Sequence, residues 1–156
     1  MLRFSLTVLL SITLCVGLAQ PLTAQSDPAK EAVTSVAETY FDAWYNGNNT
    51  HMAEIVHPML AKRGPIIREE KDIELSDMSA LKLIRTTEAG GGSSAPDSLV
   101  GKSIDVLSIS SDIASVKVDS ILLTEYLQLI KWKGDWKIIN VLWEIKPKWR
   151  SKWNYN

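Results

Sequence analysis

The chain holds few side chains that could act as nucleophiles, general bases or metal ligands, since it contains only two histidines and one cysteine. His51 and His57 are six residues apart, and Pro58 ends any helix that would carry both, so they do not form a helical metal pair. The one cysteine, Cys15, lies in an apolar N-terminal stretch. A phosphate-binding loop would be a glycine-rich loop that follows a strand and opens a helix, and the sequence has no such motif. We therefore expect neither a metal site nor a bound cofactor.

His57 leaves two interpretations open. It could act as a general base if its imidazole faced the phenol of Tyr40 across a pocket. Alternatively, the His-Pro step serves only to fix the turn of the chain into a strand.

Aromatic side chains are the other candidates for contact with a ligand. Tyr40 and Trp44 are four residues apart, which places them on one face of a predicted helix, and Trp143 lies in a predicted strand. A buried phenol or indole needs a hydrogen-bond partner, which a ligand can supply. Packing in the core and contact with a ligand both remain open for these three residues.

Three helices are predicted to position these side chains. The first covers residues 28–46, because Asp27 can cap it, Pro28 suits its first position and Gly47 can close it. A two-turn helix over residues 50–56 stops before Pro58. Ser76 is predicted to cap a third helix that runs to about residue 89, and the glycines of residues 90–92 then form a flexible connector.

Strands are predicted in the second half of the chain, where apolar residues recur with a period of two from residue 102 onward. Residues 125–132 and 136–145 form a hairpin around residues 133–135. Residues 59–75 are charged and irregular, with one or two short strands. Helices followed by antiparallel strands predict an α+β fold.

The final strand is apolar on both faces, which a sheet with one solvated face would not need. One side carries Ile139, Val141, Trp143 and Ile145, and the other carries Trp136, Ile138 and Leu142. We predict a homodimer that covers the second face. The alternative is that the C-terminal tail of the same chain covers it.

The N-terminus has the pattern of a secretory signal peptide over residues 1–24. Arg3 provides a positive charge, residues 4–19 are almost wholly apolar, and Ala24 precedes a suitable cleavage point. The alternative is a membrane anchor. Cleavage would remove Cys15, and we expect the product to be exported to a periplasmic or extracellular location.

Composition and charge limit the partners. The formal net charge of −1 gives no support for a nucleic-acid partner, and 46% hydrophobic residues suit one globular domain. Residues 148–156 form a basic, aromatic tail, and residues 146–156 hold four bases, three aromatics and no acid. The tail either makes weak membrane or envelope contact or folds back onto the sheet.

Several motifs resemble the nuclear transport factor 2-like superfamily. They are YFDAWYNGN at residues 40–48, VHP at 56–58, YLQLIK at 126–131 and GDWKIIN at 134–140. AKRG at residues 61–64 and NVLWEI at 140–145 are similar to the branch called "putative lumazine-binding" (SnoaL-like). The resemblance implies a domain over residues 25–147 with a cystatin-like, cone-shaped fold, in which a curved antiparallel sheet wraps around the long N-terminal helix and encloses a pocket.

The superfamily includes ketosteroid isomerase, which uses a phenol and two carboxyl groups. Tyr40 matches the phenol position by its offset from Gly47. The base would fall near Gly64, where the chain has no acid. Glu125 is one residue away from the second carboxyl position, so we expect it to face away, on the opposite side of its strand. Isomerase chemistry of this type is therefore not expected.

The resemblance predicts a small-molecule-binding protein that holds its ligand inside the cone. Lys62 and Arg63 would either bind an acidic ligand at the entrance of the pocket or form ion pairs with acids at residues 69–72 on the surface. An enzyme of isomerase, dehydratase or cyclase type that uses His57 with Tyr40, and a dimeric interaction module with a filled pocket, are the alternatives. The candidate lining residues are Tyr40, Trp44, His57, Tyr126 and Trp143.

Overall fold

The computed structural model describes residues 27–69, 72–95 and 101–150. The predicted signal peptide and the end of the tail, residues 151–156, lie outside the described residues. Within the described ranges, no helix has the length and apolar character needed to cross a membrane.

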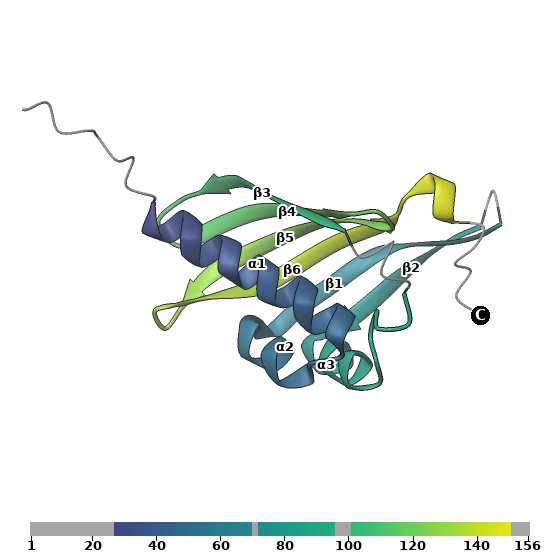
Figure 1. Ribbon diagram of the computed structural model, residues 1–156, viewed down its shortest axis with the longest axis horizontal. Helices are drawn as coiled ribbons and strands as arrows, with labels where there is room; N and C mark the ends of the chain where they lie inside the picture. The colour runs from purple at the N-terminus through teal and green to yellow at the C-terminus, as the bar shows by residue number, and fades with distance from the viewer. Residues whose placement is uncertain (1–26, 70–71, 96–100, 151–156) are drawn as a thin grey trace, which may run out of the picture.

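The long first helix, α1 (Pro28–Asn46), has the predicted bounds and lies across the concave side of the sheet (Figure 1). The carboxylate of Asp27 accepts a hydrogen bond from the backbone N–H of Ala29, and Gly47 ends the helix with a φ of 66°. The buried face of the helix carries Val33 and Ala37, which are fully buried in the core. This helix therefore fixes the position of every side chain it turns toward the sheet.

Two shorter helices, α2 (Asn49–Ile55) and α3 (Ala80–Glu88), follow. The side chain of Asn48 caps α2, and the hydroxyl of Ser79 caps α3 by accepting from the backbone N–H of Lys82. The prediction that Ser76 caps the third helix was wrong by three residues, because Ser79 is the cap and residues 76–79 still pair as a strand with residues 61–64.

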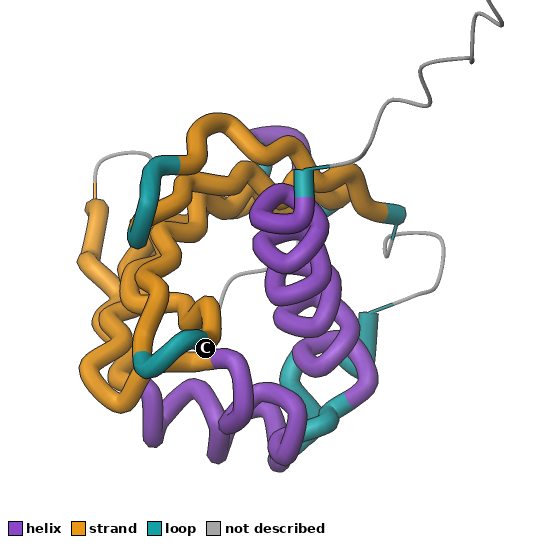
Figure 2. The backbone as a smooth tube through the Cα atoms, turned by 90° about the vertical axis from the view of Figure 1, so that its left-hand side faces the viewer, coloured by secondary structure: helices purple, strands orange, loops and turns teal. Residues whose placement is uncertain are grey.

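Six strands form one curved, unclosed sheet that wraps around α1 (Figure 2). They are β1 (Val56–Glu69), β2 (Asp72–Ser79), β3 (Lys102–Ile109), β4 (Ile113–Ser120), β5 (Leu123–Trp132) and β6 (Asp135–Ile145), in the order β2-β1-β6-β5-β4-β3. The expected α+β fold is confirmed. The sheet is not wholly antiparallel, however, because β1 and β6 pair in parallel.

Strands β1 and β2 are much longer than the short strands predicted for residues 59–75. Leu60, Lys62 and Gly64 alternate along the inner side of β1, and all three are buried. A lysine and a glycine on the buried face hide the alternation of apolar and polar residues that normally identifies a strand. The sequence of this segment therefore looks irregular although its backbone is extended.

A bulge in β6 changes which side chains face the core. Gln128 pairs with Asn140 and Leu129 pairs with Ile138, so Ile139 is an extra residue in the ladder. The strand therefore presents residues of both predicted faces to the core, and the face assignment made from strict alternation was wrong. The buried residues of β6 are Trp136, Ile138, Val141 and Trp143.

The described start of the C-terminal tail is fixed at one end of the sheet. A short 3₁₀ helix, Pro147–Trp149, follows β6, and the indole N–H of Trp149 donates to the carbonyl of Ile121 at 2.9 Å. Arg150 pairs with Glu144 at 2.9 Å. These contacts hold the tail on the turn between β4 and β5.

Candidate functional site

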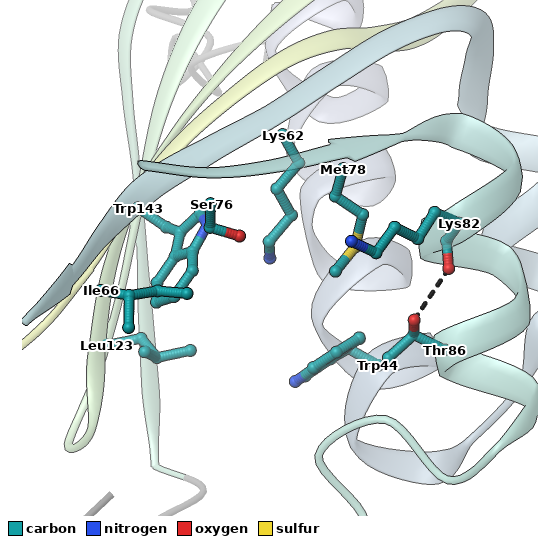
Figure 3. Close-up of a pocket in the computed structure, with 9 residues that line it drawn as sticks. All are labelled: Trp44, Lys62, Ile66, Ser76, Met78, Lys82, Thr86, Leu123 and Trp143. Carbon is teal, nitrogen blue, oxygen red and sulfur yellow. Dashed lines mark hydrogen bonds between the residues drawn. The ribbon is translucent and has the colours of Figure 1, made fainter. Parts of the chain in front are cut away.

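A cavity of about 230 Å³ lies between the C-terminal half of α1, helix α3 and the inner side of the sheet (Figure 3). Two indoles form part of its wall, and the polar groups of the lining are two lysines, two hydroxyls and the indole N–H groups. No acidic side chain is among the described residues that line it. The lining residues are Trp44, Lys62, Ile66, Ser76, Met78, Lys82, Thr86, Leu123 and Trp143.

A buried triad of polar side chains lies at one end of the cavity. The ammonium of Lys62 donates to the phenol oxygen of Tyr40 at 2.6 Å and to Oε1 of Glu125 at 2.7 Å. The phenol of Tyr40 in turn donates to the same carboxylate oxygen at 2.8 Å. The three residues are between 1% and 5% exposed, so the ion pair is shielded from water. Burial of this kind is tolerated only where the charges neutralise each other and are hydrogen-bonded.

Burial raises the pKa of Tyr40 well above its usual value near 10, and the negative charge of Glu125 and the hydrogen bond to it raise this pKa further. The phenol therefore keeps its proton at neutral pH. The phenol donates its proton in a hydrogen bond to Glu125 and accepts one from Lys62, so Tyr40 positions the ion pair between these two residues.

The ammonium of Lys62 is also surrounded by aromatic rings. It lies 5.2 Å from the ring centre of Trp44, 5.3 Å from that of Tyr40 and 5.8 Å from that of Trp143. Cations are attracted to the faces of such rings at these distances. An ammonium has three N–H groups, and hydrogen bonds within the described residues occupy two of them. The third can donate to a molecule in the cavity.

Glycines allow both indoles to take their positions. A Cβ atom on Gly64 would lie 2.3 Å from the carbonyl oxygen and 2.6 Å from the ring of Trp143. A Cβ atom on Gly92 would lie 2.6 Å from Nε1 of Trp44. Any side chain at either glycine would therefore displace a wall of the cavity.

The glycine run at residues 90–92 was predicted to be a flexible connector, and the structure corrects this. The backbone N–H of Gly92 donates to the carbonyl of Trp44 at 3.0 Å, and Gly91 donates to Thr86 at 2.9 Å. The run is a hydrogen-bonded turn in contact with an indole of the cavity. Its glycines permit close approach to Trp44.

Of the five predicted lining residues, Trp44 and Trp143 line the cavity, and Tyr40 lies behind the ammonium of Lys62. Tyr126 does not, because it is 46% exposed on the outer side of β5. The expectation that Glu125 faces away was also wrong. Glu125 is buried on the same side of β5 as Leu127, as alternation along the strand requires.

His57 is buried but does not line the cavity. Its Nδ1 atom accepts a hydrogen bond from the backbone N–H of Met59 at 3.1 Å. Its ring meets the ring of Trp132 edge-on, with 4.7 Å between the ring centres. These contacts match the interpretation that the His-Pro step fixes the entry of the chain into β1.

Sequence reasoning missed the burial of Lys62. It predicted a cation at the mouth or a surface partner of residues 69–72, whereas Arg63 is the exposed member and pairs with Asp77 at 3.0 Å. A usable signal was present in β5, where Glu125 shares the parity of the apolar residues Leu127 and Leu129. A single acid on an apolar face implies a buried partner for its charge.

Among the residues that the structure describes, no group of three or more histidine, cysteine, aspartate or glutamate side chains is placed to hold a metal ion. The polar end of the cavity instead combines an ammonium, a phenol and a carboxylate. This set suits hydrogen bonding to an organic molecule.

Solved structures share the fold at low sequence identity. An NTF2-like protein of unknown function from Silicibacter pomeroyi is 20% identical, with a TM-score of 0.57 over 76% of this chain and 96% of that chain. A protein with a cystatin-like fold from Caulobacter vibrioides is 14% identical, with a TM-score of 0.53 over 79% and 94% of the two chains. A ketosteroid isomerase-like protein from Erwinia carotovora is 12% identical, with a TM-score of 0.52 over 77% and 98%. At these identities the likeness shows the fold alone.

A search of curated protein sequences found no match. Residues 28–144 match the family described as "Putative lumazine-binding". This range contains α1 and all of the six described strands except Ile145, the last residue of β6, and it includes every described residue that lines the cavity. Together with the NTF2-like and cystatin-like structures, this match covers most of the chain. The chain therefore belongs to the "Putative lumazine-binding" family, and its fold is the one shared by the NTF2-like structures.

Proposed function

We propose that this protein is exported and binds a small, partly apolar molecule between Trp44 and Trp143, without transforming it. The observation that carries the proposal is the Lys62 ammonium, which is held by Tyr40 and Glu125 beneath two indoles and keeps one N–H for the cavity. A hydrogen-bond donor fixed in an apolar enclosure is the usual composition of a small-molecule site.

The size and walls of the cavity restrict the ligand. Sites for drug-sized ligands usually measure about 300–1,000 Å³, and this cavity measures about 230 Å³. Trp44 and Trp143 offer flat, apolar surfaces, while Met78 adds a thioether that adapts to the shape of an aromatic partner. A compact, planar molecule with at least one acceptor atom fits these features.

The state of the titratable groups favours binding over catalysis. A general base needs a free lone pair within reach of the substrate, and a general acid needs a proton it can release. Glu125 is neutralised by Lys62, the pKa of Tyr40 is raised by burial, and His57 accepts from the backbone of Met59. The alternative, an enzyme of the same fold using His57 with Tyr40, would need these contacts to break.

A homodimer through the outer side of the sheet is part of the proposal. Tyr126 and Leu142 are directly paired across β5 and β6, and they are 46% and 59% exposed. Apolar residues that adjoin on an open sheet face are typical of an interface. A dimer whose cavity has no ligand would instead support the alternative of an interaction module.

Native mass spectrometry of protein purified from cells that export the full chain tests the proposal. We expect a dimer whose mass exceeds that of the two chains by one or two small molecules. Lumazine, which the family description names, is the first compound to add to protein without such a mass. A Trp44→Leu variant should lose the added mass, and a Trp132→Leu variant, altered far from the cavity lining, should keep it.

Two results would contradict the proposed binding, and a third would contradict the proposed export. The first is a folded protein that carries no added mass and binds no compound of a planar-heterocycle panel. The second is an added mass that persists unchanged in Trp44→Leu, which would place the ligand elsewhere. Retention of the N-terminal 24 residues in protein recovered from the producing cells would contradict export by cleavage.

A further inference from the structure

We infer that the cavity selects a molecule with one negative charge, and that its two lysines perform different tasks. Lys82 binds the negative charge, whereas Lys62 donates a hydrogen bond to a neutral acceptor such as a ketone or amide oxygen. The planar apolar part of the molecule lies between the two indoles. This inference rests on the proposed function and names the chemical class of its ligand.

The neutrality of the acceptor at Lys62 follows from Glu125. The carboxylate of Glu125 is 2.7 Å from the ammonium and already balances its charge. An anion brought to the remaining N–H of Lys62 would also approach this carboxylate, in a place where water does not screen the repulsion. A carbonyl oxygen accepts the same hydrogen bond without a charge.

The need for a negative charge follows from Lys82, which projects from α3 toward the space that Lys62 enters from β1 (Figure 3). Its ammonium donates to the backbone carbonyl of Asp77 at 3.5 Å, the limit of a hydrogen bond. Among the described residues, no carboxylate is paired with Lys82, and no acid lines the cavity. Lys82 is an exposed residue that lines the cavity, and with Lys62 balanced by Glu125 it supplies the one positive charge that no described acid balances in this lining.

Thr86 is the polar neighbour of Lys82 on α3, and it donates its hydroxyl proton to the backbone carbonyl of Lys82. Ser76 lies on the other side of the cavity, beside the indole of Trp143 (Figure 3), in the strand position that pairs with Gly64. An acid group near Lys82 therefore carries its apolar body toward an aromatic surface.

Four aromatic probes separate the two tasks. They are 4-acetylbenzoate and 4-acetylphenylacetate, which carry a ketone and a carboxylate at two spacings, 4-ethylbenzoate, which lacks the ketone, and 4-methylacetophenone, which lacks the charge. Isothermal titration of the protein purified from exporting cells with each probe gives four dissociation constants. We expect the better keto acid to bind about fivefold or more tightly than either single-group probe, as exposed ion pairs and single hydrogen bonds allow.

Substitutions assign each preference to its lysine. Lys82→Met should abolish the preference for the keto acid over 4-methylacetophenone, and Lys82→Arg should restore it. Lys30→Met removes an exposed lysine that does not line this cavity, and it should leave all four constants unchanged. The double variant Lys62→Met with Glu125→Gln should lose the preference for the ketone and keep the preference for charge.

The carbonyl stretching frequency of bound 4-acetylbenzoate tests the same contact in the unaltered protein, so the inference does not depend on the folding of the double variant. A hydrogen bond from Lys62 lowers this frequency below its value in an apolar solvent. An unshifted frequency would overturn the role of Lys62. Equal binding of 4-methylacetophenone and the keto acids would overturn the role of Lys82 and leave the proposed function standing.

Absence of binding by every probe would overturn the inferred ligand class, a planar keto acid or its equivalent. The proposed function is then judged separately, by the added mass on the purified dimer. A small neutral molecule found in that experiment would confirm binding and contradict the requirement for charge. An anion whose added mass survives Lys82→Met would contradict it as well.

Discussion

Lys62 and Glu125 form an ion pair of 2.7 Å between two strands that are far apart in the chain, and both side chains are almost completely buried. The phenol of Tyr40 hydrogen-bonds to both partners. Helix α1 and strands β1 and β5 therefore meet at one set of polar atoms. The hydrogen bonds at the polar end of the cavity therefore also hold α1, β1 and β5 together.

Removing one partner of this ion pair should be more harmful than removing both. Lys62→Met leaves the Glu125 carboxylate buried without a counter-charge, which costs about 3–5 kcal/mol of unfolding free energy. Lys62→Met combined with Glu125→Gln should cost less than Lys62→Met alone, because no uncompensated charge remains. Urea unfolding of the single and double variants measures both values. If the double variant loses as much unfolding free energy as Lys62→Met and Glu125→Gln lose in sum, Lys62 and Glu125 are not coupled.

The phenol of Tyr40 should contribute to stability through its hydrogen bond to Glu125. Tyr40→Phe removes this donor from a buried carboxylate, which costs about 1–3 kcal/mol. Tyr126→Phe is the matched control, since that phenol is exposed on the outer side of β5 and its loss should change stability by less than about 0.5 kcal/mol. Equal effects of the two substitutions would contradict the stabilising role of Tyr40.

Alkaline pH should destabilise the protein through the same phenol. Because the pKa of Tyr40 is raised in the folded state, the folded chain keeps a proton that the unfolded chain releases above about pH 10. The unfolding free energy should therefore be unaffected by this group below pH 10 and should fall above it, by up to about 1.4 kcal/mol per pH unit. The slope above pH 10 should be shallower in Tyr40→Phe. Identical slopes in the two proteins would contradict the shift in pKa.

Gly64 should be required for both stability and binding. The methyl group added in Gly64→Ala would overlap the carbonyl and ring of Trp143, and such overpacking costs about 1–3 kcal/mol. The displaced indole should also weaken ligand binding, measured by titration of the bound compound. Gly101→Ala is the control, because its new methyl group would meet only Ile121 at an ordinary 3.7 Å. Unchanged binding in Gly64→Ala would show that Trp143 need not hold its position.

The outer side of the sheet should control assembly. Leu142→Glu places a charge beside Tyr126 at the centre of the proposed interface and should convert the dimer to a monomer, as measured by light scattering after size-exclusion chromatography. Leu107→Glu is the control, because Leu107 is similarly exposed but lies in β3, an edge strand. A dimer that persists in Leu142→Glu would place the interface elsewhere.

Local signals predicted the helices well and the lysine site poorly. The cap at Asp27, Pro28 and the left-handed Gly47 identified α1 to the residue, since these determinants act within one turn of the chain. The inward orientation of Lys62 depends on Glu125, 63 residues later in the chain. No local pattern distinguishes such a lysine from one that faces water.

The errors in the second half have equally specific causes. Strict alternation assigned Ile138 and Val141 to opposite faces, but the bulge at Ile139 turns both inward. Tyr126 was predicted to line the pocket, whereas the parity of Leu127 and Leu129 in β5 indicates that Glu125, and not Tyr126, faces inward. Strand periodicity in β5 was therefore a better guide than the likeness to a distant relative.

The parallel pairing of β1 with β6 sets the order in which this sheet can be completed. The first strand has the last one as its neighbour, so β1 and β2 remain a separate hairpin until the C-terminal residues of the domain have been synthesised. Contacts of such long sequence separation close slowly, because the chain loses loop entropy before the contacts form. A chain cut short within β6 would leave the open edge of β1 exposed to other chains, so aggregation is the expected fate of truncated products.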